Sequence, residues 1–175
     1  MLKSFFRMLR ARDGLAAIEF AFVAPVMIVM FFGAVELSAA VDCKTRVTHV
    51  ASTAADLVAQ ETTVSSTDMS NVFAALNAIV FPYPSGAAKI VISSILYKTS
   101  TTGTVEWSDV QNATKRTVGS TVTIPAGLMS AGGSVILAEI TYTYASPTTQ
   151  VLTGAVTMTG SFYAHPRRSA KVLHT

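Results

Sequence analysis

The strongest constraint on the fold is an apolar run near the N-terminus, from Leu15 to Val35, in which Glu19 is the only charged side chain. An α-helix rises about 1.5 Å per residue, so about 20 residues cross the hydrocarbon core of a bilayer. The run therefore predicts a membrane-spanning helix. We expect Pro25 to kink this helix, which membrane helices tolerate. On insertion scales a charged side chain costs about 2.5–3.5 kcal/mol at the centre of a membrane helix and less near the interface, so the position of Glu19 requires an explanation.

The positive charge of the chain is confined to the residues before this run. The formal net charge is +3, and residues 1–14 contribute all of it, because residues 15–175 carry equal numbers of basic and acidic side chains. Basic residues beside an apolar segment hold that end in the cytoplasm. We therefore expect a single-pass protein with a cytoplasmic N-terminus and an exported C-terminal part. A nucleic-acid partner is not expected, since it would need basic residues clustered on the folded part.

Three interpretations of the N-terminal segment compete. A plain signal anchor explains the basic flank and the length but leaves Glu19 unexplained. A cleaved secretory signal would use the small residues at 38–40 as its site, but Glu36 falls where the end of its apolar core should be neutral. In a prepilin leader, a membrane-embedded protease cuts after a glycine on the cytoplasmic side, here between Gly14 and Leu15.

The prepilin interpretation alone gives Glu19 a role. Cleavage after Gly14 places Glu19 five residues into the mature chain, about one helical turn from the new amine of Leu15. In a filament, the carboxylate of one subunit can then meet the amine of a neighbour. Such a pair is strongly favoured at low dielectric when it is made, whereas either charge alone is costly.

The segment GLAAIEFAFVAPVMIVMFFGAVEL resembles the N-terminal signature of TadE-like proteins, the pseudopilins of tight-adherence (Flp-type) pilus systems. Four residues match that signature in order and spacing: Gly14, Glu19, Phe20 and Pro25. Many such prepilins carry Tyr where this chain has Phe20. The resemblance covers residues 10–47, and the Pro-Arg ending at 165–168 is similar to the endings of such proteins.

This resemblance implies a minor pilin or pseudopilin of the bacterial inner membrane, with its C-terminal domain in the periplasm or, after assembly, in an extracellular pilus. The implied partners are a prepilin peptidase that cuts between Gly14 and Leu15, other pilins and pseudopilins, the Tad secretion machinery and inner-membrane lipid. Glu19 and Phe20 are implied to act in processing and assembly. An ordinary type IV or type II secretion pseudopilin is the neighbouring alternative. The larger TadG-like relatives share the signature but carry a much longer domain.

The apolar helix is predicted to continue beyond the membrane to Gln60. An apolar stripe recurs at spacings of three and four residues, opposite a polar face: Ala40, Cys43, Val47, Val50, Ala54 and Leu57. The whole helix would be roughly 70 Å long, half in the membrane and half packed on a domain. Cys43 is the only cysteine and lies on the stripe, so we expect a small buried residue there.

The rest of the chain predicts one short helix and then β-strands. Asp68 or Ser70 is expected to cap a helix that ends at the segment Phe81–Gly86. Period-two or β-rich segments predict strands at residues 89–98, 104–110, 121–124, 134–145 and 155–164. Val105 and Trp107 are expected on one face of their strand. The basic tail after residue 165 is expected to be frayed.

These elements predict an α+β, pilin-like fold, in which a long N-terminal helix packs on a C-terminal antiparallel sheet. Four segments are expected along the chain: a basic leader at 1–14, a transmembrane segment at 15–36, an amphipathic extension of the helix at 37–60, and an exported α+β domain at 61–175.

The exported part lacks a catalytic pattern, so neither an enzyme nor a cofactor is expected. Its histidines have no metal-ligand spacing: His49, His165 and His174. His49 is interpreted as a solvated residue of the helix face. Glu106 and Asp109 are interpreted as an exposed turn. Three aromatic residues admit a sugar-stacking surface, although packing in the sheet or core is the favoured interpretation: Trp107, Tyr142 and Tyr144.

Two functions of different classes follow from these observations. The first is a TadE-like pseudopilin that assembles into a tight-adherence pilus for surface attachment. The alternative is a membrane-anchored module that binds an envelope or carbohydrate partner through the three aromatic residues. An envelope hydrolase is a distant third.

Overall fold

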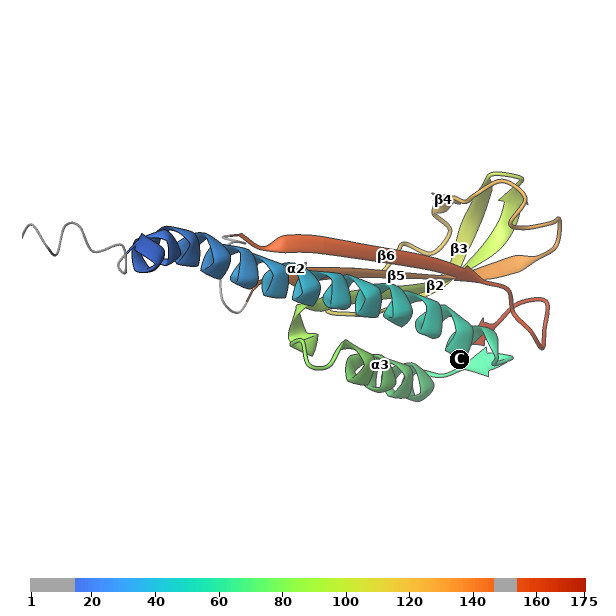
Figure 1. Cartoon of the computed structure of the whole chain (residues 1–175). Coiled ribbons are helices and arrows are strands. Elements are labelled where there is room, and N and C mark those ends of the chain that lie inside the picture. The colour runs from blue at the N-terminus through green and yellow to red at the C-terminus, as the bar shows by residue number, and fades with distance from the viewer. Residues whose placement is uncertain (1–14, 147–153) are drawn as a thin grey trace, which may run out of the picture.

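The computed structural model describes residues 15–146 and 154–175, with a helical arm that extends from a globular domain (Figure 1). The arm and one side of the domain belong to the same helix, α2, Leu15–Ala59. The sequence predicted a helix to Gln60, so this prediction is confirmed within one residue. The helix continues through Pro25.

The domain is built on a five-stranded antiparallel sheet with the strand order β4-β3-β2-β5-β6. Its strands are β2 Ala88–Thr99, β3 Thr102–Gln111, β4 Thr121–Thr123, β5 Ser134–Tyr144 and β6 Val156–Ala164. A short 3-10 helix, η2, Ser85–Ala87, precedes β2. The C-terminal half of α2 packs across β5 and β6. The predicted α+β fold, a long helix on an antiparallel sheet, is confirmed.

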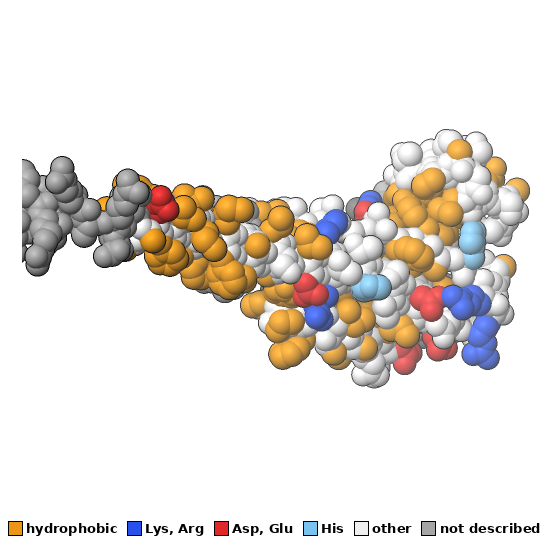
Figure 2. Space-filling view, in the orientation of Figure 1, with side chains coloured by type: hydrophobic (Ala, Val, Ile, Leu, Met, Phe, Trp, Pro, Cys, Tyr) orange, Lys and Arg blue, Asp and Glu red, His pale blue; other side chains and the backbone are white. Residues whose placement is uncertain are grey.

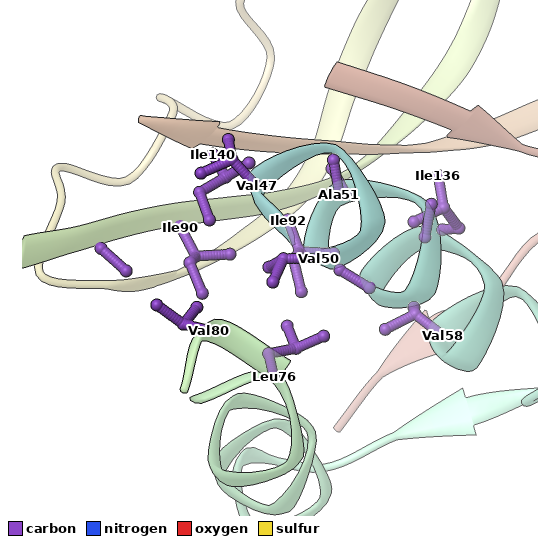
Figure 3. Packing of buried hydrophobic residues seen from close by; sticks show 14 of the residues in the cluster. Val47, Val50, Ala51, Val58, Leu76, Val80, Ile90, Ile92, Ile136 and Ile140 are labelled. Carbon is purple, nitrogen blue, oxygen red and sulfur yellow. The ribbon is translucent and has the colours of Figure 1, made fainter. Parts of the chain in front are cut away.

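The main core lies between α2, the sheet and a second helix, α3, Ser66–Val80. Strands β2 and β5 pair so that Ile90 faces Ile140 and Ile92 faces Ala138. Figure 3 shows the side chains of Ile90, Ile92 and Ile140 together with residues of α2 and α3, among them Val47, Val50, Ala51, Val58, Leu76 and Val80.

The buried face of α2 is wider than the predicted stripe. Cys43, Val47, Val50 and Ala54 are buried as expected, but Leu57 is half-buried. Four further residues of α2 are buried: Ala51, Ala55, Val58 and Ala59. The physical reason is that α3 covers a second side of the helix, and the sequence pattern of α2 alone does not show that partner.

Gly160 in β6 allows α2 to approach the sheet closely. A Cβ atom at this position would lie 3.2 Å from the carbonyl oxygen of Val47 and 3.2 Å from Cγ2 of Ile140. Both distances are tighter than ordinary van der Waals contact. The missing side chain thus sets the distance between helix and strand.

The sheet carries one hydrophobic cluster on each face, and a β-bulge in β3 changes which face the residues of that strand reach. Ser94 pairs with Trp107 and Ile95 with Val105, which leaves Glu106 as the extra residue. Because the bulge reverses the alternation of side chains, Val105 and Trp107 face opposite sides of the sheet, and the prediction that they share a face is wrong. Val105 joins a second cluster on the far face: Ile95, Val105, Val122, Ile124, Met129, Val135 and Leu137.

Helix α3 begins one turn earlier than predicted. Its N-cap is Ser65, whose hydroxyl accepts the backbone N–H of Asp68 at 3.2 Å. The Asp68 carboxylate accepts the backbone N–H of Ser65 at 2.9 Å in return. This is a capping box, so Asp68 is the third helical residue and not the cap.

The C-terminal tail is ordered against the domain, and the prediction that it is frayed is wrong. Strand β7, Leu173–His174, pairs in parallel with β1, Thr63–Val64. The indole N–H of Trp107 donates to the carbonyl of Val172 at 2.8 Å, and Val172 is fully buried. The tail is fixed because a strand distant in sequence supplies its hydrogen-bond partners.

Charged residues of the tail region also have partners in the domain. Asp109 accepts from Lys115 at 2.6 Å and contacts Nε2 of His174 at 2.7 Å. Lys171 forms an ion pair with Glu106. Glu106 and Asp109 therefore belong to a strand with ion-pair partners, and their interpretation as an exposed turn is wrong. Burial alone would raise the pKa of Asp109, but its hydrogen bonds to Lys115 and His174 outweigh burial and lower that pKa.

Candidate functional site

The arm formed by the first half of α2 is the largest exposed apolar surface that the structure describes (Figure 2). Its most apolar 18-residue window has a mean hydropathy of 2.3, and none of that window is buried. A surface of this size would be covered in a native environment. Because α2 is long and apolar enough to cross a membrane, the arm indicates membrane anchoring through a single N-terminal helix.

Glu19 lies near the N-terminal end of the arm, in the second turn of α2. Its side chain is exposed, and in the described residues no hydrogen bond or ion pair joins it to another group. Phe20 beside it is also exposed. Leu15 is the first residue of α2, one helical turn before Glu19, whereas Gly14 lies outside the described residues.

A second carboxylate, Glu36, marks the point at which the arm enters the domain. Its side chain is only 2% exposed, in contrast to its neighbours Val35 and Leu37. Burial raises the pKa of the nearby Tyr144 hydroxyl, and the negative charge of Glu36 raises it further. From the sequence, Glu36 was interpreted only as a charge that does not fit a secretory signal peptide. A charged residue directly after a long apolar run is the sequence feature that could have predicted where the arm enters the domain.

Next to Glu36, a polar network joins α2 to the segment that follows α3. The Tyr83 hydroxyl donates to the carbonyl of Ala39 at 2.8 Å and lies 3.1 Å from Oδ2 of Asp42. Arg46 Nε donates to the same Asp42 oxygen at 2.8 Å, and Arg46 Nη1 donates to the carbonyl of Phe81 at 2.6 Å. This network fixes the segment to the helix just beyond the apolar run.

The titration behaviour of the network follows from these contacts. Burial, with a contribution from the Asp42 carboxylate, raises the pKa of Tyr83 to about 12. The hydrogen bond from Arg46 lowers the pKa of Asp42. The tyrosine therefore stays protonated and the carboxylate ionised around neutral pH, which preserves the donor and acceptor of the contact.

The geometry thus consists of an exposed apolar helix with one carboxylate near its tip and a polar network at its base. Residues 14–56 match the TadE-like protein family model. The resemblance expected from the N-terminal sequence is thereby confirmed. The TadE-like match begins at the predicted cleavage glycine and covers nearly all of α2. No curated protein and no solved structure matches the chain.

The aromatic residues considered for sugar binding are not available at the surface. Trp107, Tyr142 and Tyr144 are all buried in the main core. The Tyr142 hydroxyl donates to the carbonyl of Pro84 at 3.2 Å, so it supports the segment before β2. The sugar-stacking interpretation is therefore wrong for these three residues, and the alternative of packing is confirmed.

The other candidate residues, a cysteine and the histidines, were considered for a reactive thiol and for a metal site. Cys43 is buried in the main core, as predicted, and burial raises the pKa of its thiol. His49 is an exposed residue of α2, as predicted. In residues 15–146 and 154–175, no group of three or more His, Cys, Asp and Glu side chains is arranged to hold a metal ion.

Proposed function

We propose that the chain is a TadE-like minor pilin or pseudopilin, which acts in the assembly of a tight-adherence (Flp-type) pilus for surface attachment. The observation that carries the proposal is the exposed apolar arm with Glu19 near its end, in a segment that matches the TadE-like family. Such an arm suits two environments in turn, a bilayer and the apolar centre of a filament.

Processing is the first step of the proposed function. The precursor sits in the bacterial inner membrane with a cytoplasmic N-terminus and a periplasmic domain, and a prepilin peptidase cuts between Gly14 and Leu15. This cut removes the residues that carry the net charge of +3 and frees an amine about one turn from Glu19. The four segments expected from the sequence, leader, transmembrane segment, helical extension and exported domain, follow this scheme.

Assembly is the second step, and it gives the Glu19 carboxylate a partner. The amine of one subunit meets the carboxylate of its neighbour in the filament centre, where a charge without a partner costs several kcal/mol. Phe20 contributes to the same contact region, and Pro25 kinks the helix. The other partners are further pilins or pseudopilins and the Tad secretion machinery.

Sequencing of the mature N-terminus tests processing in a bacterium that carries the matching peptidase. The proposal expects a start at Leu15. An intact Met1, or a start at Val41 after a secretory cut, would contradict it.

Glu19→Ala tests the assembly step separately. This variant should still be cleaved and exported, because Glu19 lies outside the globular domain, yet it should not enter pili. The matched control is Glu61→Ala, which removes an exposed carboxylate of the domain. Normal incorporation of the Glu19→Ala variant into pili would refute the amine-pairing role.

The alternative function, a binding module on a membrane tether, is no longer supported by the observation that suggested it. It rested on three aromatic side chains that the structure places in the core.

A further inference from the structure

The segment between α3 and η2 carries an exposed aromatic side chain on a firmly held backbone. Phe81 is 72% exposed, more than any other large hydrophobic residue that the structure describes outside α2. Its carbonyl accepts the hydrogen bond from Arg46, and the backbone N–H of Tyr83 donates to the carbonyl of Val80 at 3.0 Å. The ring is thus presented to the outside by a backbone that is already fixed.

The position of this segment along α2 coincides with the end of the apolar run. A groove of about 470 Å³ lies between them, lined by Phe31, Ala34, Val35, Ser38, Ala39, Asp42 and Tyr83. The hydrogen bond from Tyr83 reaches Ala39, four residues beyond Val35, or about 6 Å along the helix axis. The headgroup layer of a bilayer is about 5–8 Å thick on each side. Tyr83 therefore lies at headgroup level when the run to Val35 fills the hydrocarbon core.

Further observations agree with a position of this segment at the headgroup level of the bilayer. Figure 1 shows the segment after α3 at the end of the domain nearest the arm, and Figure 2 shows hydrophobic side chains at that end, continuous with those of the arm. The ring of Tyr83 packs edge-on against Tyr144 at 5.8 Å. Val156, which pairs with Tyr144, is 41% exposed. Aromatic residues gather at membrane interfaces because their rings are apolar at one end and polar at the other.

We propose that the segment Phe81–Pro84 is a membrane-contact site, in which Phe81 inserts at the boundary between lipid headgroups and acyl chains. The partner is the lipid interface, because the exposed ring continues the surface that α2 buries in the bilayer. The contact fixes the depth of the arm and the orientation of the domain. It adds little ordering cost, since the backbone is held before insertion. The inference requires only that α2 spans a membrane, in either orientation.

A polarity-sensitive fluorophore at position 81 tests this inference in the full-length chain. Phe81→Cys is labelled with a nitrobenzoxadiazole dye, and Cys43 stays unlabelled because it is buried, which mass spectrometry verifies. The matched control is Val118→Cys, because Val118 is 65% exposed and lies between β3 and β4. Both proteins are reconstituted in vesicles of phosphatidylcholine and phosphatidylglycerol, and flotation verifies that both are anchored.

We expect the dye at position 81 to show blue-shifted emission. It should also lose fluorescence when the phosphatidylcholine carries a nitroxide near the headgroup end of its acyl chain. The dye at position 118 should show neither effect. Water-like emission at position 81 in vesicles that carry the anchored protein would overturn the inference. A blue shift without quenching by the nitroxide lipid would also overturn it, because the ring would then be covered by protein and not by lipid.

Discussion

The hydrogen bond from Trp107 to Val172 is predicted to hold the C-terminal tail in place. The substitution Trp107→Phe keeps an aromatic ring in the core but removes the indole N–H, which donates to the buried carbonyl at 2.8 Å. A buried acceptor left without its donor costs about 1–3 kcal/mol. If this cost falls on the tail alone, the equilibrium for local opening of β7 rises by about 5- to 150-fold, since 1–3 kcal/mol corresponds to that range.

Amide hydrogen exchange measures this opening directly. The N–H of Leu173 donates to Thr62 at 3.1 Å, and that of Thr175 donates to Val64 at 3.0 Å. In the detergent-solubilised variant, both amides should exchange faster by the stated factor. The amides of the β2–β5 pair at Ile90 and Ile140 should keep their rates, because the sheet core is not altered.

A control separates the lost hydrogen bond from general damage to the sheet. Tyr97→Phe removes a hydroxyl from a residue that packs on the second core, and it should leave the exchange of Leu173 unchanged. Unchanged Leu173 exchange in Trp107→Phe would refute the reasoning. Equal acceleration over all strands would also refute it, because the tail would then have no separate opening equilibrium.

Three further predictions concern the domain, each measured on the detergent-solubilised full-length chain. Gly160→Ala should lower the free energy of unfolding by about 1–3 kcal/mol, because the added Cβ overpacks against α2. Gly86→Ala is the control and should not lower it, because a Cβ there meets nothing within 4 Å. Equal melting temperatures for the two variants would count against a close approach of α2 to β6 at Gly160. Leu76→Ala should cost about 2–5 kcal/mol because Leu76 is fully buried between α3 and α2, and a loss below 1 kcal/mol in denaturant unfolding would mean that α3 contributes little. Because the pKa of Asp109 is lowered in the folded state, its ionised carboxylate stabilises the fold above the ordinary carboxyl pKa, and this stabilisation is lost as the pH falls through the lowered pKa. Asp109→Asn should therefore make the free energy of unfolding depend less on pH below about pH 4. An unchanged pH dependence would show that Asp109 is not its source.

The N-terminal part of the molecule could be predicted from the sequence alone. Helix α2 is specified by local information, namely an apolar run of membrane length followed by a stripe with helical period. The same is true of the TadE-like signature, since its residues lie within one short segment of the chain. The strands of the sheet were also predicted within about two residues, because alternation and turn residues are local signals.

The tertiary structure decided the features that depend on distant partners. The tail is ordered because β1 and Trp107, far away in sequence, supply hydrogen bonds. One extra residue in β3 sends Val105 and Trp107 to opposite faces, and no composition pattern records such a register shift. The membrane-facing segment at Phe81 has the same origin, since only the packing of α3 on α2 brings it beside the end of the apolar run. Helical period and hydropathy are properties of neighbouring residues, whereas burial, register and ion pairing are set when separate elements meet.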